Sequence, residues 1–389
     1  MYLPSDLTQK EMHRNYQETN NSSISYQFYG RVMKSMNIGM VKLGHEECES
    51  CIEAIQHQQL SKHTAEMAGI DSCSICEKYF EHLRLAKAAR TEYREDGESI
   101  KPGHVVLAVD LQKVIQLPRM EGLKTIVFSQ RLIAFNETFA PVGKYTRALP
   151  VVACVWNEAI RGRSSADLLG CFHRVVTKFS KVDKLVLWLD NCAAQNKNWN
   201  LFLHLIILLN SKNIQMKELV LKFFESGHTF MAADSFHAAV EGAMRRHPPI
   251  TYSDFKAVVQ GAKQKVEVMD MVPEHFFTAA FTVSQYVLNK LSPRPYIDNI
   301  RQVVIKKGSL EFYYSNSVNG DDLKSCKIFT TKQENIISSD DFDLEHLLKK
   351  QCKPRGIDEG RKSALLGTIL PMIDEEKQQF WIDLPTIGD

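Results

Sequence analysis

The 389-residue sequence has almost no net charge, no long apolar run, and few glycines and prolines. Lys and Arg (48) exceed Asp and Glu (46) by only two, which excludes a histone-like polycation and leaves any nucleic-acid contact to local patches. The longest apolar run, residues 201–209, is interrupted by His204 and is far shorter than a membrane span of about 20 residues. With 44% apolar and 24% charged residues, the composition is that of a globular protein and excludes collagen-like, disordered and coiled-coil chains.

The cysteines and the first residues are unlike those of a secreted protein. The nine cysteines are odd in number and five of them are scattered singly, which disfavours a disulfide framework. The first residues, MYLPSDLTQKEMHRNY, form neither the apolar core of a signal peptide nor an Arg-rich, acid-free transit pattern. We therefore expect a soluble, intracellular protein in a reducing compartment, with two or three domains.

Short apolar runs alternate with amphipathic segments from residue 104 onward. The runs that predict strands are residues 104–110, 124–130, 149–156, 184–190 and 218–224, and the segments that predict helices are 164–180, 199–209 and 234–245. The order is three strands, helix, strand, helix, strand, helix. It predicts an α/β core, a mixed sheet flanked by helices.

The segments on either side of this core differ from it and from each other. Residues 1–47 predict short helices, and residues 75–94 predict a longer helix with cations at three- to four-residue steps: Arg84, Lys87, Arg90 and Arg94. This face is either a solvated helix surface or a stripe that contacts phosphates. The C-terminal part predicts a mixed α+β region with a hairpin at 301–306 and 311–315. The expected domains are an N-terminal helical segment (1–47), a zinc-knuckle and basic-helix region (48–100), the core (101–247) and the C-terminal region (248–389).

Acidic residues follow the predicted strands. Asp110 and Asp190 each end an apolar strand, where a carboxylate usually faces a cleft or a cation because burying it in the core is costly. Asp234, His237 and Glu241 have the spacing of one helix face. Such carboxylates suit a pair of hard cations, Mg²⁺ or Mn²⁺, which about 4 Å apart would activate a nucleophile and stabilise the leaving oxygen in phosphoryl transfer.

A group of polar residues lies next to these acids in the sequence. We expect these residues to contact a substrate, or else to serve as turn, helix-cap and structural groups: Asn191, Gln195, Asn196, Lys197, His228 and His237. The basic residues Arg84, Lys87 and Arg90 are further candidates for substrate contacts.

Two cysteine pairs have the spacing of a zinc site. Cys48-x2-Cys51 and Cys73-x2-Cys76 are separated by 21 residues, and two such pairs supply four thiolates to one tetrahedral, structural Zn²⁺. The alternatives are four free thiols or a mixed site. The mixed site would use one of three histidines in place of a cysteine: His57, His63 or His82.

Several segments also resemble a known group of proteins: DLQKVIQLP (110–118), WNEAIRGRSSADLLGC (156–171), LDNCAAQNKN (189–198), GHTFMAADSFHAAVE (227–241) and GIDEGRKSALLGTILPMIDEEKQQFW (356–381). They are similar to an uncharacterised, transposable-element-derived domain family of animals, over about residues 25–385. The order of elements and acids resembles the RNase H-like core of DDE/DDD transposases and integrases. The resemblance implies Asp110 and Asp190 as the first two catalytic acids and Asp234 as the third, with Glu241 as its rival.

The resemblance also implies a function. It suggests a metal-dependent nuclease and strand transferase that acts on DNA, in the nucleus or cytoplasm, as a monomer or homo-oligomer, without a membrane or an organic cofactor. The sequence departs from the family at Cys192-Ala193-Ala194, where a glycine pair is common. Two other hypotheses remain: a domesticated or decayed transposase that binds DNA or protein without catalysis, and a zinc-stabilised scaffold.

Overall fold

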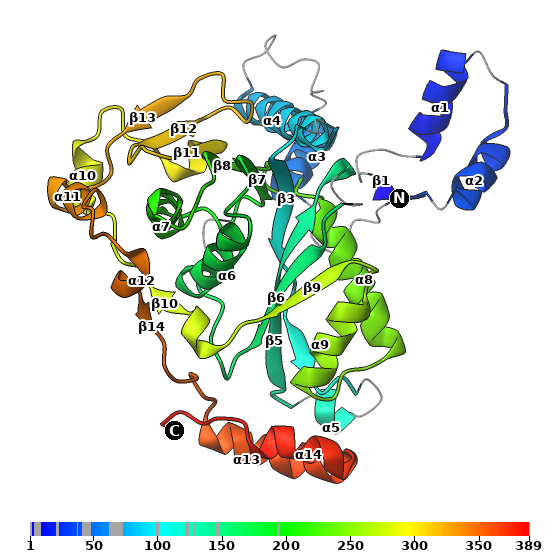
Figure 1. The fold of residues 1–389 in the computed structure, drawn as a ribbon. Coiled ribbons are helices and arrows are strands. Elements are labelled where there is room, and N and C mark those ends of the chain that lie inside the picture. The colour runs from blue at the N-terminus through cyan, green and yellow to red at the C-terminus, as the bar shows by residue number, and fades with distance from the viewer. Residues whose placement is uncertain are drawn as a thin grey trace. The chain divides into compact units, whose positions relative to one another are not determined.

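A computed structural model describes residues 2–3, 9–20, 23–36, 38–40, 48–61, 73–98, 101–120, 124–127, 129–144, 148–192 and 195–388. The chain divides into two compact units, Met1–Arg84 and Leu85–Asp389, and the division falls inside one long helix, α4 (Figure 1). The elements that begin in the first unit are β1 (Tyr2–Leu3), α1 (Gln9–Asn20), α2 (Tyr26–Ser35), β2 (Gly39–Met40), α3 (Glu49–Ser61) and α4 (Ser74–Glu98).

The first unit contains a small helical pair. Helix α2 begins after Ser25, whose hydroxyl accepts a hydrogen bond from the backbone N–H of Phe28 at 3.3 Å, the usual cap of a helix N-terminus. The ring of His13 on α1 packs edge-on against Tyr26 and Tyr29 of α2. These contacts join α1 to α2, in agreement with the short helices predicted for residues 1–47.

The second unit is built on one large mixed sheet. Its strands are β3 (His104–Leu111), β4 (Ile115–Leu117), β5 (Leu132–Pro141), β6 (Val151–Asn157), β7 (Lys184–Leu189), β8 (Glu218–Phe223), β9 (Val266–Asp270), β11 (Gln302–Lys306), β12 (Phe312–Ser315) and β13 (Lys324–Cys326). Their order is β13-β12-β11-β8-β7-β3-β5-β6-β9, and β4 pairs with β5.

The central strands run in a defined pattern. Strand β7 is parallel to both β3 and β8, whereas β5 is antiparallel to both β3 and β6. The carboxyl ends of β3, β7 and β8 therefore meet at one edge of the sheet, which is where ligands bind in open α/β folds.

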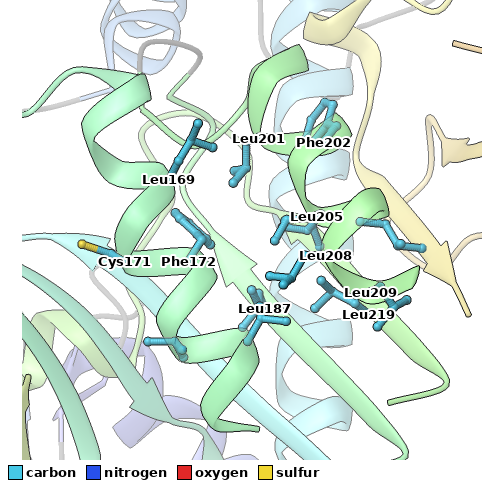
Figure 2. Close-up of a cluster of buried hydrophobic side chains, with 14 of the residues drawn as sticks. Leu169, Cys171, Phe172, Leu187, Leu201, Phe202, Leu205, Leu208, Leu209 and Leu219 are labelled. Carbon is cyan, nitrogen blue, oxygen red and sulfur yellow. The ribbon is translucent and has the colours of Figure 1, made fainter. Parts of the chain in front are cut away.

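Helices cover both faces of this sheet. The helices are α5 (Lys124–Val127), α6 (Ser165–Lys178), α7 (Trp199–Asn210), α8 (Ala232–Arg246), α9 (Tyr252–Gly261), α10 (Gln285–Lys290), α11 (Thr331–Ile337), α12 (Leu344–Leu347), α13 (Glu359–Ile369) and α14 (Glu375–Ile382). Helices α6 and α7 pack on one face, where Phe172, Leu187 and Leu205 share a buried cluster (Figure 2). Helices α8 and α9 pack on the other face, where Phe236, Phe255 and Trp188 belong to a second buried cluster.

Both faces are buried because the strands carry apolar side chains on both sides. Seven consecutive residues of β6 are buried, as are the last five of β7, which is the pattern of strands covered on two faces. Helix α7 is apolar all round and has nine successive buried residues, 201–209. None of the helices in the described part of the chain combines the length and apolarity that crossing a membrane requires.

Shorter elements complete the second unit. They are β10 (Phe277–Thr278), which pairs with β14 (Lys349–Lys350), and the 3-10 helices at Pro273–His275, Ile297–Asn299 and Leu370–Met372. The predicted hairpin is confirmed, since β11 and β12 are antiparallel neighbours.

One expectation about the fold requires correction. Residues 124–127 form helix α5, and the second strand of the core is instead β5, ten residues long and paired on both sides. The domain boundary expected at residue 247 stays a prediction; the sheet itself continues beyond this residue, because β9 pairs with β6 and β11 pairs with β8.

Candidate functional site

Two of the predicted acids converge with a histidine at the carboxyl edge of the sheet. Asp110 lies near the end of β3, and Asp234 and His237 lie three residues apart on one face of α8, in its first two turns. One ligand atom from each of the three side chains lies within 4.8 Å of the other two. All three are partly exposed, so a small ligand can reach them from solvent.

A chain of hydrogen bonds orients the His237 ring. Its Nε2 lies 3.0 Å from the Thr138 hydroxyl, which in turn donates to Asn136 Oδ1 at 3.2 Å. Because the Thr138 proton is used there, the Thr138 oxygen accepts from Nε2–H, and the Nδ1 lone pair of a neutral ring faces Asp110 Oδ2 at 3.4 Å. Two acceptors that face each other favour a proton or a cation between them.

Asp234 also caps its own helix. Its Oδ2 accepts a hydrogen bond of 2.8 Å from the backbone N–H of Met231, which holds the carboxyl at the start of α8. Burial raises the pKa of Asp234, and the negative charge of Asp110 raises it further. The local sequence thus fixes the position of a carboxyl group that repels its neighbour unless a cation joins them.

Asp190 follows β7 directly, next to the first group. Its Oδ1 accepts hydrogen bonds from Asn196 Nδ2 at 2.7 Å and from the Cys192 backbone at 3.4 Å. Its pKa is raised to about 6, first by burial and also by the charges of Asp110 and Asp234. The charge of Asp110 thus contributes to the raised pKa values of both Asp190 and Asp234, which indicates one electrostatically coupled acidic site.

Glu241 lies outside this group. Its carboxylate pairs with Arg119 Nη1 at 3.1 Å and with Lys113 Nζ at 3.9 Å. Of the two candidates for the third acid, Asp234 therefore lies close to Asp110. Glu241 lies further along α8 and forms ion pairs with Lys113 and Arg119 instead.

The polar residues after Asp190 have mainly internal partners. Asn196 and Lys197 are almost fully buried. Asn196 holds Asp190, while Lys197 Nζ donates to Asn191 Oδ1 at 2.6 Å and to the Asp298 carbonyl at 3.3 Å. Gln195 is partly exposed. These residues build the loop that carries Asp190, in which Gln195 is more exposed to solvent than Asn196 and Lys197.

Replacing Lys197 by Met should change how stability depends on pH. The pKa of Lys197 is lowered to about 7, mainly by burial and then by the charge of Arg301, so between pH 7 and the usual lysine pKa the unfolded chain binds more protons. The stability of the wild type should therefore rise as the pH rises through this range. From pH 7 to 9 it should gain about 2 kcal/mol relative to Lys197→Met, measured by denaturant unfolding; parallel pH profiles would contradict this.

The basic residues predicted to share one face of α4 have different surroundings. Arg84 forms two hydrogen bonds of 2.7 Å with Glu81, and Lys87 is exposed. Arg90 donates to the backbone carbonyls of Phe230 and His228 and lies over the ring of Phe224. Arg90 therefore holds the loop between β8 and α8, in which His228 lies, and its guanidinium is not a free phosphate contact.

Sequence reasoning missed the residues of β5 that support the site. Thr138 and Asn136 orient His237, and Glu137, on the opposite face of β5, is fully buried and has no hydrogen-bond partner for its carboxyl oxygens in the described structure. Burial raises the pKa of Glu137 well above its usual range. The run of polar residues Asn136, Glu137 and Thr138 inside an apolar segment was the available signal.

The paired cysteines gather with histidines in two groups. Cys48 and Cys51 lie with His82, and Cys73 and Cys76 lie with His57, each set having its ligand atoms within 4.8 Å. The pKa of Cys51 is raised to about 12, mainly by burial and then by Cys48. The expected single site of four thiolates is thus replaced by two mixed groups, each able to hold a metal such as zinc. His63 lies outside the described residues.

Part of the chain matches a known protein family. Residues 165–319 match the model of a domain of unknown function, DUF7869. This span includes Asp190 and the helix that carries Asp234 and His237, but not Asp110. No curated protein and no solved structure matches the chain.

Proposed function

We propose that this protein is a metal-dependent nuclease or strand transferase of transposon origin that acts on DNA by phosphoryl transfer. The observation that carries the proposal is the convergence of Asp110, Asp234 and His237 at the carboxyl edge of the sheet, with Asp190 electrostatically coupled to them. Perturbed acids that cluster where a fold usually binds ligands are typical of active sites.

The topology supports an RNase H-like core. The five central strands follow the order β6-β5-β3-β7-β8, with β5 antiparallel to both of its neighbours. This order, with Asp110 near the end of β3 and Asp190 directly after β7, agrees with the resemblance to DDE/DDD transposases. The proposal of DNA as the substrate rests on that resemblance.

The donor set fits a divalent cation. Asp110, Asp234 and His237 would hold it, and Asp190 would join them once ionised. Carboxylates suit Mg²⁺ and Mn²⁺ alike, whereas an imidazole ligand favours a transition metal, so we expect Mn²⁺ to bind more tightly than Mg²⁺. When bound, the ion supplies Lewis-acid stabilisation of phosphoryl oxygens and lowers the pKa of a nucleophile.

The chain's own residues prepare the site for this chemistry. Thr138 fixes the His237 ring so that Nδ1 points to Asp110, and Asn196 and the Cys192 N–H hold one oxygen of Asp190. Such fixed second partners keep ligands in one orientation and raise metal affinity. Gln195 lies beside Asp190 in the sequence and is available to contact a phosphate.

Nicking of labelled duplex DNA tests the proposal. The protein should nick DNA when Mn²⁺ is added, less efficiently with Mg²⁺, and not at all with a chelator. Asp190→Asn should abolish nicking because the amide cannot supply a negative ligand. Asp183→Asn is the matched control, since Asp183 precedes the same strand β7 at its opposite end and pairs with Lys217; it should nick like the wild type.

Other outcomes have distinct meanings. Equal nicking by the wild type and Asp190→Asn would overturn the catalytic proposal. Salt-dependent DNA binding without nicking under all metal conditions would instead favour a transposase derivative that binds DNA without catalysis.

A further inference from the structure

We infer that helices α3 and α4 hold two zinc sites, each built from the cysteine pair at the start of one helix and the histidine of the other helix. The inference concerns the first unit alone and does not rest on the proposed nuclease activity. In place of one ion bound by four thiolates, it predicts two ions. Each ion is bound by the two cysteines of one helix start and by the histidine of the other helix, an arrangement that we call exchanged coordination.

A short internal repeat underlies the two sites. Cys48, Cys51 and His57 have the pattern C-x2-C-x5-H, and the same pattern recurs 25 residues later at Cys73, Cys76 and His82. In both copies the first cysteine directly precedes a helix, and the histidine is the ninth residue of that helix. The two helices therefore present the same ligands at the same positions.

Helix geometry prevents the three ligands of one copy from sharing an ion. Cys51 and His57 are six residues apart on α3, which is a rise of about 9 Å along the axis. Ligands of one zinc ion, at about 2.0 to 2.3 Å from the metal, lie only about 3.5 Å from each other. Each histidine must therefore serve the cysteines of the other copy.

The observed contacts have this exchanged arrangement. Cys48 Sγ lies 3.2 Å from His82 Nε2, and Cys73 Sγ lies 3.2 Å from His57 Nε2. The start of α3 is thus beside the ninth residue of α4, and the start of α4 is beside the ninth residue of α3, so the helices run antiparallel. Both distances are close to the ligand spacing of a tetrahedral zinc ion.

The chemistry of each group matches zinc. Two thiolates neutralise the charge of Zn²⁺, an imidazole adds a third ligand, and a further group fills the fourth position. Two ions would join α3 to α4 at both ends of the helix pair and contribute directly to its folding.

Zinc content and cysteine protection test the inference in the full chain. Protein purified from zinc-supplemented cells and then dialysed against excess Mn²⁺, which would occupy the acidic site of Asp110, Asp234 and His237, should contain two zinc ions per chain by elemental analysis and native mass spectrometry. One ion or none would overturn the inference. This measurement needs no variant, so a failure of any variant to fold does not affect it.

Alkylation of the His57→Ala variant distinguishes exchanged from local coordination. After a mild chelator, Cys73 and Cys76 should be alkylated faster than in the wild type, while Cys48 and Cys51 stay protected. If Cys48 and Cys51 were alkylated faster, either alone or together with Cys73 and Cys76, exchanged coordination would be contradicted. His346→Ala is the control, because His346 is exposed and should leave both the zinc content and the alkylation pattern unchanged.

Discussion

Asp234→Asn should lower the rate of metal-dependent DNA nicking by at least about 100- to 1000-fold, whereas Glu241→Gln should leave it within a few-fold of the wild type. Both variants replace a carboxylate of α8 by an amide of the same shape. The comparison therefore isolates the negative charge at each of two positions on one helix, and nicking rates at saturating Mn²⁺ measure it.

The difference follows from the partners of the two acids. Asp234 shares its ligand group with Asp110 and His237, and an amide there would weaken the binding of a divalent cation. Glu241 instead pairs with Arg119 and Lys113, where its loss should reduce stability more than catalysis. Loss of nicking in Glu241→Gln with normal nicking in Asp234→Asn would show that the third acid is wrongly assigned.

Folding has to be separated from catalysis in Asp234→Asn. The asparagine Oδ1 can still accept from the Met231 N–H that Asp234 bonds now, so the helix start is preserved. We expect the variant to unfold at nearly the wild-type denaturant concentration while the affinity for Mn²⁺, measured by calorimetry, falls. A variant that unfolds early but still binds Mn²⁺ would contradict a ligand role.

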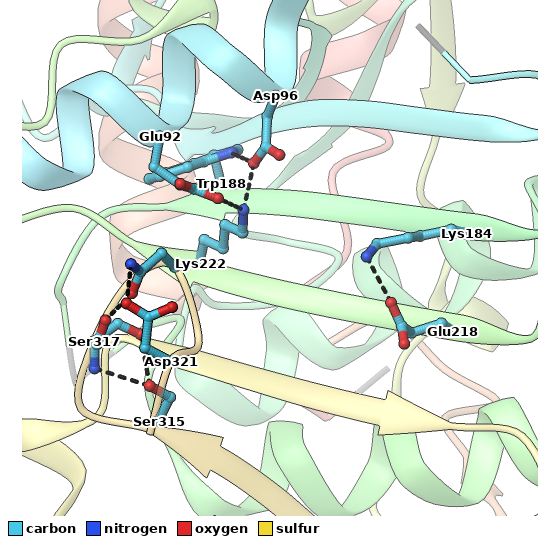
Figure 3. Close-up of polar contacts among 10 residues, drawn as sticks. Glu92, Asp96, Lys184, Trp188, Glu218, Lys222, Ser315, Ser317 and Asp321 are labelled. Atoms are coloured by element: carbon cyan, nitrogen blue, oxygen red, sulfur yellow. Dashed lines mark hydrogen bonds and ion pairs between the residues drawn. The ribbon is translucent and has the colours of Figure 1, made fainter. Parts of the chain in front are cut away.

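Lys222→Met should destabilise the protein by about 3 to 5 kcal/mol, the largest effect expected of a single change away from the acidic site. Lys222 is buried on β8, and its Nζ lies 2.6 Å from Glu92 and 2.7 Å from Asp96 on α4 (Figure 3). Asp96 also accepts a hydrogen bond from Trp188 Nε1 at 2.9 Å. Removing the cation leaves two neighbouring carboxylates in a mostly buried location.

A second lysine of the same sheet provides the control. Lys184 Nζ lies 2.6 Å from Glu218, with about a third of each side chain exposed (Figure 3), so Lys184→Met should cost less than about 1 kcal/mol. Adding Glu92→Gln and Asp96→Asn to Lys222→Met should recover part of the loss, because no unpaired charge remains. Denaturant unfolding of the four proteins measures this, and equal losses for both lysines would refute the role of burial.

The acids of the candidate site could be predicted because each follows an apolar strand. Asp110 ends a continuous apolar run, and Asp190 ends a second one that pairs with it in parallel, so their proximity follows from strand order alone. Asp234 and His237 follow from helical periodicity. What the sequence left open was the choice between Asp234 and Glu241, which depends on cations from distant parts of the chain, Lys113 and Arg119.

Strand β5 was not among the strands predicted from the sequence. Its core side chains are interrupted by Asn136, Glu137 and Thr138, all of which are buried, and buried polar residues break the apolar pattern that indicates a strand. Their burial is stabilised by partners far away in sequence, such as His237. A neighbouring segment, residues 124–130, has a clearer apolar pattern, yet its described part forms the short helix α5.

The cysteines illustrate a different difficulty. Spacing alone indicated Cys48, Cys51, Cys73 and Cys76 as candidate metal ligands but could not say how many ions they would hold. The number of ions depends on the antiparallel pairing of α3 and α4 and on two histidines. His57 and His82 each follow the second cysteine of their pair by the same number of residues. The positions of the histidines and cysteines together, C-x2-C-x5-H in both copies, are the sequence signal of the repeat.

The pairing of β9 with β6 and of β11 with β8 has a consequence for synthesis on the ribosome. As the chain emerges, β6 and β8 are the outer strands of the nascent sheet, and the backbone groups on their outer sides have no strand partner until residues 266–270 and 302–306 have been made. Unpaired edges of this kind invite association with other chains. The protein is therefore most exposed to chaperones while its second half is being translated.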